Sequence, residues 1–429
     1  MERSFASWEK EVIRCIRCGA CQNVCPVFKE LQAESTVARG RVKLILGIIN
    51  QDLDITSGFI DKMSLCLMCK ACVPNCPSGV QVDKLVEAAR KEIVEQKGLS
   101  PLKGMIFRFV LKNRRVFNTG MRTGRLFQGL LFRKGPSGQG MLPRMTLGID
   151  KRRLLSPLAS KPFKSLYPEI IKVPNAKMRV AFFTGCMINY IYTDTGTAVI
   201  NVLKQNGVEV VIPALQNCCG APVRINGDYK TAQEMARANI DVLLKEEVNA
   251  VVVACGTCGL TLKEEYAELL AEDQTYADKA KQLGSKVKDF TELVVDLEGF
   301  QDKMGSLPLK VTYHDPCHLV RGLKVKDQPR QIIKSIPGVA FQEMNKPDTC
   351  CGSGGSFSLY HYELSTKIND NKVNDIDQTG AEVLVTGCSA CRMHLIDGLN
   401  RQNLAVKVMH TAQLLDMAYR AKVHPIEKV

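Results

Sequence analysis

Cysteine spacing constrains this chain more than any other feature, because all 18 cysteines fall into four regular sets. Two of the sets are copies of one pattern: a single cysteine, an adjacent pair and a C-x-x-C. The intervals are 31 and 35 residues in one copy and 32 and 36 in the other. The copies are Cys186, Cys218, Cys219, Cys255 and Cys258, and Cys317, Cys350, Cys351, Cys388 and Cys391. Such a constant register indicates an internal duplication with two equivalent sites.

The other eight cysteines form a doubled C-x2-C-x2-C-x3-C-P run near the N-terminus. This is the bacterial ferredoxin spacing, in which the fourth cysteine of each run ligates the other cluster. One [4Fe–4S] cluster is therefore expected on Cys15, Cys18, Cys21 and Cys76, and a second on Cys66, Cys69, Cys72 and Cys25. A structural zinc site is the alternative, but zinc modules usually carry two cysteine pairs separated by a longer loop.

The N-terminal sequence bears on the oxidation state of these thiols. MERSFASWEK has mixed charges and no apolar stretch, so no export signal is visible, and we expect a cytoplasmic protein. Metal binding is then favoured over disulfide formation. No uncharged apolar run is long enough to cross a bilayer, so membrane contact would be peripheral, on the inner face of the cell membrane.

Hydrophobic periodicity predicts an α+β multidomain chain. Between Cys25 and Cys66 the apolar residues recur every three or four positions, which predicts an α-helical ferredoxin module. From Met178 onward short apolar strands run into the cysteine loops and alternate with helices, so the thiols should gather at one edge of a parallel sheet in each copy. The expected domains are a helical ferredoxin domain at 1–100, a connecting segment at 101–177, and two duplicated α/β domains at 178–306 and 307–429.

Positive charge is concentrated in residues 101–164, which contain 15 lysines and arginines against one acid, Asp150. Arg108, Lys112 and Arg115 can share one helical face. Another face would carry Leu102, Ile106, Phe109 and Val110. A basic amphipathic segment suits an anionic membrane surface or an acidic partner, but a linker packed on its own domains explains the pattern equally well. No nucleic acid is expected, because no recognised binding motif accompanies the charge.

The two five-cysteine sets resemble the duplicated cysteine-rich CCG domains found in three groups of proteins. These are the B and D subunits of heterodisulfide reductases, the iron-sulfur subunits of glycolate and lactate oxidising enzymes, and a subunit of anaerobic glycerol-3-phosphate dehydrogenase. With the ferredoxin module in front, the order is most similar to the glycolate oxidase iron-sulfur subunit. The resemblance covers nearly the whole chain, least specifically at 101–164. It implies that each complete set can ligate a noncubane [4Fe–4S] cluster, in addition to the two cubane clusters.

The resemblance also implies an oxidoreductase subunit that transfers electrons. A FAD-containing partner would oxidise a 2-hydroxy acid such as glycolate or lactate, and this chain would pass the electrons to a quinone or another carrier. No G-x-G-x-x-G motif follows a strand, so the chain shows no dinucleotide site of its own. The iron-sulfur subunit of an anaerobic glycerol-3-phosphate dehydrogenase remains an alternative.

A catalytic alternative also stays open, since in heterodisulfide reductases the two noncubane clusters face each other and cleave a disulfide. No substrate-contacting catalytic residue can be assigned from the sequence. Three residues near Cys317 are candidates for tuning a cluster or donating protons: His314, His318 and Arg321. Residues in such positions also cap helices and satisfy backbone groups. A zinc-carrying scaffold is the third possibility.

Overall fold

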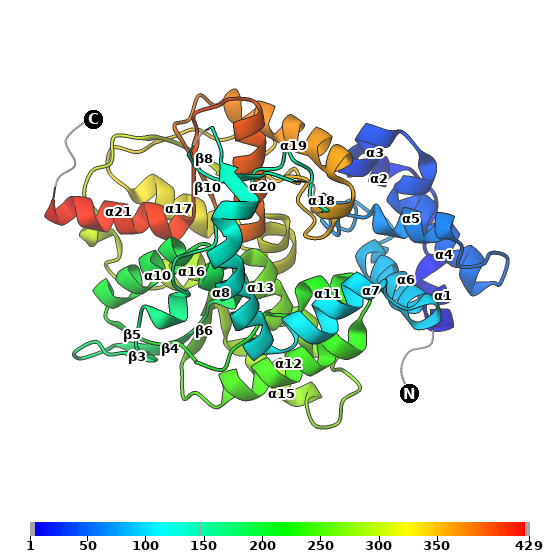
Figure 1. Cartoon of the computed structure of the whole chain (residues 1–429), viewed down its shortest axis with the longest axis horizontal. Helices are drawn as coiled ribbons and strands as arrows, with labels where there is room; N and C mark the ends of the chain where they lie inside the picture. The colour runs from blue at the N-terminus through cyan, green and yellow to red at the C-terminus, as the bar shows by residue number, and fades with distance from the viewer. Residues whose placement is uncertain (1–4, 137, 146–147, 425–429) are drawn as a thin grey trace.

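The computed structural model describes residues 5–136, 138–145 and 148–424 of the 429-residue chain. A helical N-terminal module lies beside two sheet-containing halves, and a long helix of the connecting segment runs across their surface (Figure 1). The mixed helix and sheet architecture predicted from the sequence is confirmed.

The N-terminal module is helical throughout, as its periodicity predicted. Its elements are η1 (Phe5–Trp8), α1 (Glu9–Val12), α2 (Ala20–Val24), α3 (Pro26–Leu31), η2 (Glu34–Thr36), α4 (Ala38–Ile49), α5 (Ser57–Ser64) and α6 (Val82–Lys97). Ile45, Met63 and Leu85 are fully buried in its core. Gly98 ends α6 at a φ of 74°, a backbone conformation that a residue without Cβ adopts readily.

The first sheet has five strands in the order β3-β5-β4-β6-β7. The strands are β3 (Ile170–Ile171), β4 (Met178–Phe183), β5 (Val208–Val211), β6 (Ala250–Val253) and β7 (Val287–Asp289). All pairs are parallel except that between β3 and β5. The apolar runs predicted β4, β5 and β6, whereas β3 and β7 are too short to give a clear alternation.

Helices cover this first sheet domain. They are η4 (Phe163–Ser165), α9 (Gly185–Tyr190), α10 (Thr193–Gln205), α11 (Ala221–Ile225), α12 (Tyr229–Leu244), α13 (Gly256–Leu260), η5 (Thr261–Glu265), α14 (Tyr266–Leu269), α15 (Ala277–Lys286) and α16 (Phe290–Val295). The sequence predicted one helix from Asn189 to Gly207. The structure has two, because the backbone leaves the helical region at Ile191 and Tyr192.

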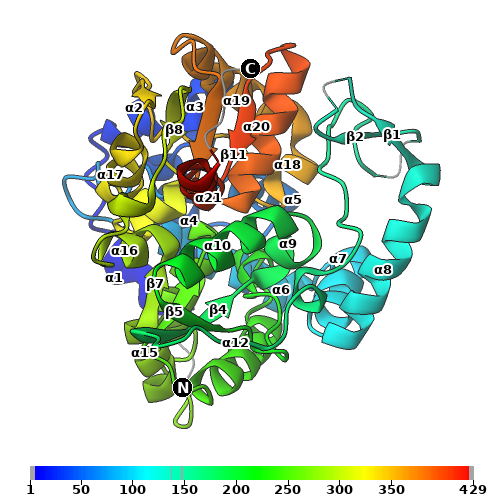
Figure 2. The ribbon, with the colours of Figure 1, turned by 90° about the vertical axis from the view of Figure 1, so that its left-hand side faces the viewer.

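The second sheet domain repeats the arrangement with four parallel strands in the order β11-β10-β8-β9. Its elements are η6 (Gln301–Lys303), β8 (Lys310–His314), η7 (His318–Leu323), α17 (Asp327–Ser335), β9 (Ala340–Phe341), α18 (Phe357–Tyr360), α19 (Tyr362–Asp377), β10 (Val383–Thr386), α20 (Ser389–Arg401), β11 (Lys407–Met409) and α21 (Thr411–Val423). Figure 2 shows this domain stacked on the first, with α10 and α21 between the sheets.

The connecting segment forms α7 (Pro101–Gly104), the π-helix η3 (Met105–Leu111), α8 (Arg114–Leu131) and a hairpin of β1 (Phe132–Lys134) and β2 (Met141–Pro143). Basic side chains help to hold it to the body of the protein. Arg108 pairs with the buried carboxylate of Asp228 at 2.9 Å, and Lys112 pairs with Glu234. Phe109, in contrast, is 59% exposed.

The two sheet domains meet where α13 packs against η7. Leu260, Leu319 and Leu323 are buried there as a small separate cluster. Glycines make this close approach possible: a Cβ on Gly256 would lie 3.1 Å from the Leu319 side chain, and one on Gly322 would lie 2.7 Å from Leu260. The contact matters because the cysteine loops of both domains border it.

Replacing Leu260 with alanine should therefore destabilise this junction. Truncating a fully buried leucine leaves a cavity and typically costs about 2–5 kcal/mol. The expected result is a lower urea midpoint for the anaerobically handled protein. Leu215→Ala, at a leucine that is 66% exposed, is the matched control and should unfold like the unmodified chain. Equal midpoints for both variants would contradict the role assigned to this contact.

Candidate metal centres

The first N-terminal thiol group surrounds a small cavity. Cys15, Cys18, Cys21 and Cys76 all line it, and Cys72 reaches it from the neighbouring loop. The Arg39 side chain closes one wall, where its Nη1 donates to the Arg17 carbonyl at 3.2 Å and its Nε pairs with Glu34. The cavity thus brings together cysteines from both runs of the doubled motif.

The second N-terminal group consists of Cys25, Cys66, Cys69 and Cys72. Burial raises the pKa of Cys25, and the nearby Cys69 and Cys66 thiols raise it further. Burial raises the pKa of Cys72 well above its ordinary value, followed by the effect of the other three thiols. Because these mutual effects act only over short distances, the four sulfur atoms share one site.

The first five-cysteine set forms a continuous run of thiol contacts at the carboxyl ends of β4, β5 and β6. Each thiol shares a hydrogen bond with the next one along the run. The order is Cys186, Cys218, Cys219, Cys258, Cys255. Cys186 lies in α9, the pair lies in the loop before α11, and the C-x-x-C leads into α13. The strand ends therefore gather the set, as the sequence predicted.

The second set repeats this run at the ends of β8, β9 and β10. Its thiols share hydrogen bonds in the corresponding order: Cys317, Cys350, Cys351, Cys391, Cys388. Four of the five cysteines are buried, and Cys317 is half-buried. The duplicated spacing has thus produced two thiol arrangements with the same connectivity.

Two further contacts join the sets into one line of sulfur atoms. The Cys255 thiol shares a hydrogen bond with Cys388, and the Gly256 amide donates to the Gly387 carbonyl at 3.0 Å. At the other end of the second set, Cys350 shares a hydrogen bond with Cys69 of the N-terminal module. The thiols consequently run without a break from the ferredoxin loops through the second set to the first.

This crowding identifies the chemistry that the donors suit. Hydrogen bonds with neighbouring thiols, together with burial, raise the pKa of Cys186, Cys219, Cys258 and Cys391 well above the ordinary value. So many buried thiolates need positive charge, and soft sulfur donors suit iron–sulfur clusters or zinc. All 18 cysteines are free thiols, so the donor sets fit metal.

His318 and Arg321 connect the modules. His318 has its Nδ1 3.2 Å from the Thr257 hydroxyl and its Nε2 3.3 Å from the Met68 carbonyl. Arg321 donates from Nη1 to the Cys69 carbonyl at 3.1 Å and from Nη2 to the Asp348 carbonyl at 2.6 Å. Both side chains therefore hold cysteine-bearing loops of different domains together, and neither caps the N-terminus of η7.

His314, the third candidate, lies at the end of β8 and is 1% exposed. One of its ring nitrogens and the sulfur atoms of Cys351 and Cys391 lie within 4.8 Å of one another. The imidazole thus faces the second five-cysteine set directly.

Sequence reasoning missed a pair of buried asparagines that brace the adjacent-cysteine loops. The Asn239 side-chain amide donates to the Cys218 carbonyl, and that of Asn369 donates to the Cys351 carbonyl, each at 2.9 Å. Both residues are completely buried. Their occurrence in the helix after the cysteine pair of each copy, α12 and α19, is the signal that could have identified them.

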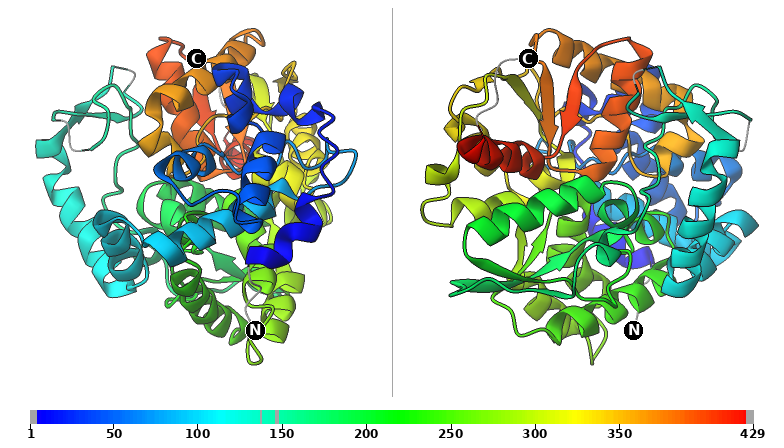
Figure 3. Two further views of the ribbon diagram at one scale, coloured as in Figure 1. Left: turned by 90° about the vertical axis from the view of Figure 1, so that its right-hand side faces the viewer. Right: turned by 60° about the vertical axis from the view of Figure 1, so that its left-hand side comes forward.

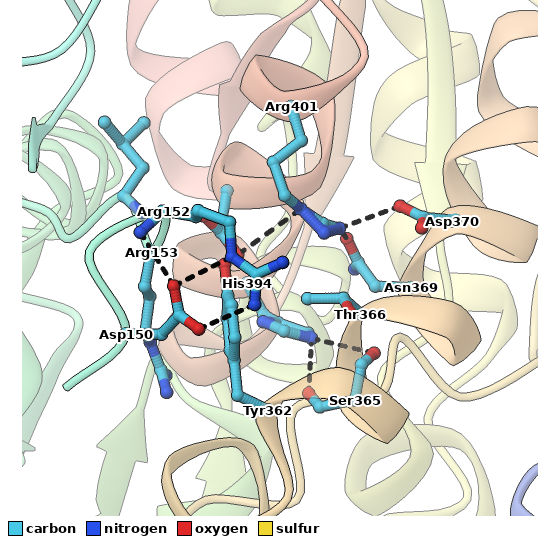
Figure 4. Close-up of polar contacts among 12 residues, drawn as sticks. Asp150, Arg152, Arg153, Tyr362, Ser365, Thr366, Asn369, Asp370, His394 and Arg401 are labelled. Carbon is cyan, nitrogen blue, oxygen red and sulfur yellow. Dashed lines mark hydrogen bonds and ion pairs between the residues drawn. The ribbon is translucent and has the colours of Figure 1, made fainter. Parts of the chain in front are cut away.

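Polar contacts around Asn369 continue this support (Figure 4). Arg401 donates to the Asn369 side-chain oxygen at 3.0 Å. The Ser365 hydroxyl lies 2.9 Å from Nε2 of His394, whose pKa burial lowers to about 4. Arg153 of the connecting segment donates to Ser358, so this segment is bonded to the second sheet domain.

A buried ionic triad joins the N-terminal module to the first sheet domain. Arg224 of α11 lies 2.5 Å from both Glu87 of α6 and Glu265 of η5, and each side chain is 4% exposed. Burial opposes the ionisation of Glu265, but the charge of Arg224 outweighs it and lowers the pKa to about 2. The guanidinium thus stabilises carboxylates from two different modules at once.

Arg224→Met should weaken this joint by leaving two buried carboxylates without their shared cation. Removing one partner of a buried pair typically costs about 3–5 kcal/mol. The measurement is anaerobic urea unfolding at neutral pH. Arg152→Met, which removes an exposed arginine paired with Asp150, is the control and should behave like the unmodified chain. A midpoint shift no larger than that of the control would contradict a structural role for the triad.

The fold and the sulfur-only donor sets define an iron–sulfur protein in which a helical dicluster module precedes two duplicated cysteine-rich domains. Residues 11–80 match the family model described as a 4Fe-4S dicluster domain, and residues 180–263 and 311–396 match that of the cysteine-rich CCG domain. The chain belongs to the family of glycolate oxidase iron-sulfur subunits and is an electron-transfer oxidoreductase subunit that binds [4Fe–4S] clusters.

Several relatives support this assignment. The probable glycolate oxidase iron-sulfur subunit of Bacillus subtilis (strain 168) is 33% identical over 95% of this chain and 94% of its own length. A fumarate reductase (CoM/CoB) subunit of Methanothermobacter marburgensis is 29% identical over 96% and 73%. Lactate utilization protein A of B. subtilis is 34% identical over 56% and 99%.

A solved structure of a hypothetical Helicobacter pylori protein shares the fold. Its TM-score is 0.51 at 10% identity, over 89% of this chain and 68% of that one. Among the described residues, no helix is both long and apolar enough to span a membrane.

Proposed function

We propose that this chain accepts electrons from a FAD-containing partner that oxidises a 2-hydroxy acid such as glycolate or lactate, and passes them to a quinone or another carrier. The relatives named glycolate oxidase iron-sulfur subunit and lactate utilization protein A support the substrate class. The observation that carries the proposal is the unbroken line of thiols through all three modules.

The ligand sets follow from the same contacts. The ferredoxin domain, residues 1–100, would hold two cubane [4Fe–4S] clusters on the two four-cysteine groups. The domains at 178–306 and 307–429 would each hold a further, noncubane [4Fe–4S] cluster on their five cysteines. When bound, such clusters supply one-electron carriers, which suits a chain that accepts the two electrons of a reduced flavin singly.

The contacts also support an order for the route. The Cys69–Cys350 contact favours transfer between the second ferredoxin group and the second five-cysteine set, and the Cys255–Cys388 contact favours transfer between the two five-cysteine sets. Arg321 and His318 would maintain these junctions by bonding the loops across them. Leu67 and Phe357 are buried beside Cys69 and Cys350 and would exclude water there.

Disulfide reduction is the second candidate function. It is favoured by the direct contact between the two five-cysteine sets and by the relative named as a fumarate reductase (CoM/CoB) subunit. Burial of the junction opposes it: Cys255 is 7% and Cys388 is 2% exposed, which leaves a disulfide substrate little access to the contact.

The proposal is tested first by the metal content of anaerobically purified protein. We expect about sixteen irons and as many sulfides per chain, and a loss of about four in Cys351→Ala. Thr349→Ala, beside the cysteine pair, is the control and should retain all of them. About eight irons, with zinc or no metal elsewhere, would confine clusters to the ferredoxin domain and contradict the four-cluster proposal.

Reduction by the substrate-reduced flavoprotein then separates the two functions. An electron carrier should be reduced by that partner and should fail to cleave a mixed disulfide when given an artificial donor. The reverse pattern would replace the proposed function with disulfide reduction.

We further propose that residues 101–164 attach the chain peripherally to an anionic membrane surface. Helix α8 lies at the outer edge of the molecule (Figure 3), with Leu126 82% exposed and Leu130 71% exposed. Arg115 and Arg122 are exposed on the same helix and make a basic surface next to these leucines. Exposed apolar side chains flanked by arginine match the chemistry of a bilayer surface.

Replacing Arg115, Arg122 and Arg125 with glutamine should weaken binding to vesicles that contain anionic lipid. Each basic residue near such a surface contributes about 1 kcal/mol, so the triple variant should lose well over tenfold in affinity. Vesicle flotation at two salt concentrations is the measurement. The control replaces Lys281, Lys279 and Lys230, which lie outside this segment. Equal binding by both triple variants would exclude α8 as the anchor.

A further inference from the structure

The two five-cysteine sites differ at one position that faces the thiols. Aligned on the cysteine that follows each strand, β4 ends in Phe183 and β8 ends in His314, each three residues before its cysteine. Both side chains are 1% exposed. The duplication therefore keeps an apolar ring in the first copy and has an imidazole in the second.

His314 has no other polar function in the protein. Apart from the Cys351 thiol, neither ring nitrogen has a hydrogen-bonding neighbour within the described ranges. Leaving a buried imidazole unsatisfied is costly, which calls for a partner that the protein itself does not supply. The ring instead lies against Cys351 and Cys391, with its ligand atom and their sulfurs mutually within 4.8 Å.

The distances suit a shared metal ion. Atoms that ligate one ion at about 2.0 to 2.3 Å in tetrahedral geometry are separated by roughly 3.5 Å, and small side-chain movements cover the remaining difference. His394, the other buried histidine near Cys351, has its Nε2 bonded to the Ser365 hydroxyl at 2.9 Å. His318 is engaged by Thr257 and Met68. Of these three histidines, His314 is the one whose ring faces the thiols without another bond.

We propose that His314 is a nitrogen ligand of the metal centre in the second five-cysteine site, which makes this site chemically different from the all-thiolate first site. The inference rests on the proposed occupancy of the second set by an iron–sulfur cluster. An imidazole ligand is neutral, whereas a thiolate is an anion, and histidine ligation raises the reduction potential of iron–sulfur centres. The second site should accordingly accept an electron at a higher potential than the first.

Pulsed electron paramagnetic resonance on the reduced full-length protein tests the assignment. The second-site signal is defined as the one lost in Cys351→Ala. In protein grown with 15N-histidine this signal should show a 15N coupling strong enough for a directly bonded nitrogen. This measurement needs no substitution of the histidine, so it stands even if variants fold poorly.

Substitutions then locate the nitrogen. His314→Phe reproduces the first copy and should abolish the coupling and lower the midpoint potential of the second-site signal, with iron retained by the five thiolates. His394→Phe, the matched control, should leave both unchanged. Phe183→His should introduce a coupling into the first-site signal, defined by its loss in Cys219→Ala.

The outcomes separate the inference from the proposed function. A second-site signal without histidine coupling, or one whose coupling survives in His314→Phe, overturns the inference while leaving the electron-transfer function intact. A chain that loses neither iron nor signal in Cys351→Ala contradicts the occupancy of the second site, and with it both proposals. Loss of the coupling only in His394→Phe would assign the bonded nitrogen to that residue and also overturns the inference.

Discussion

The structure depends on bringing buried sulfur atoms together without a protein cation among them. In each five-cysteine set the thiols contact one another in sequence, and neighbouring thiols and burial raise the pKa of most of them. Such a group resists ionisation unless a metal supplies positive charge. The surrounding fold accordingly uses its polar contacts to hold the loops: Asn239 and Asn369 bond the cysteine-pair carbonyls.

The duplication explains why the two sulfur sites adjoin. Each copy presents its C-x-x-C at the start of a helix, and the copies are stacked so that Cys255 meets Cys388. Small residues at this junction, Gly256 among them, leave room for leucine side chains of the opposite copy. The second copy has in addition acquired contacts with the ferredoxin loops, through Cys350 and Arg321. Equivalent sequences thus occupy unequal environments, one internal and one at the module boundary.

The connecting segment shows how charge is divided between packing and exposure. Arg108 and Lys112 are used internally, against Asp228 and Glu234 of the first sheet domain. Arginines further along α8 face outward beside exposed leucines. A net charge of +14 therefore overstates the free positive surface of this segment, because part of it is neutralised by acidic residues of the same chain.

The donor chemistry, the duplication and the succession of elements follow from the residues alone. Cysteine spacing is a local property, and the helical periodicity before Cys66 and the apolar runs β4 and β8 are local as well. The docking of the domains, in contrast, determines which thiols touch, as Cys69 does with Cys350, and that His314 rather than His318 faces the second site. Those contacts depend on buried leucines and on the Arg224 triad, which join segments far apart in the chain, and no local spacing encodes that arrangement.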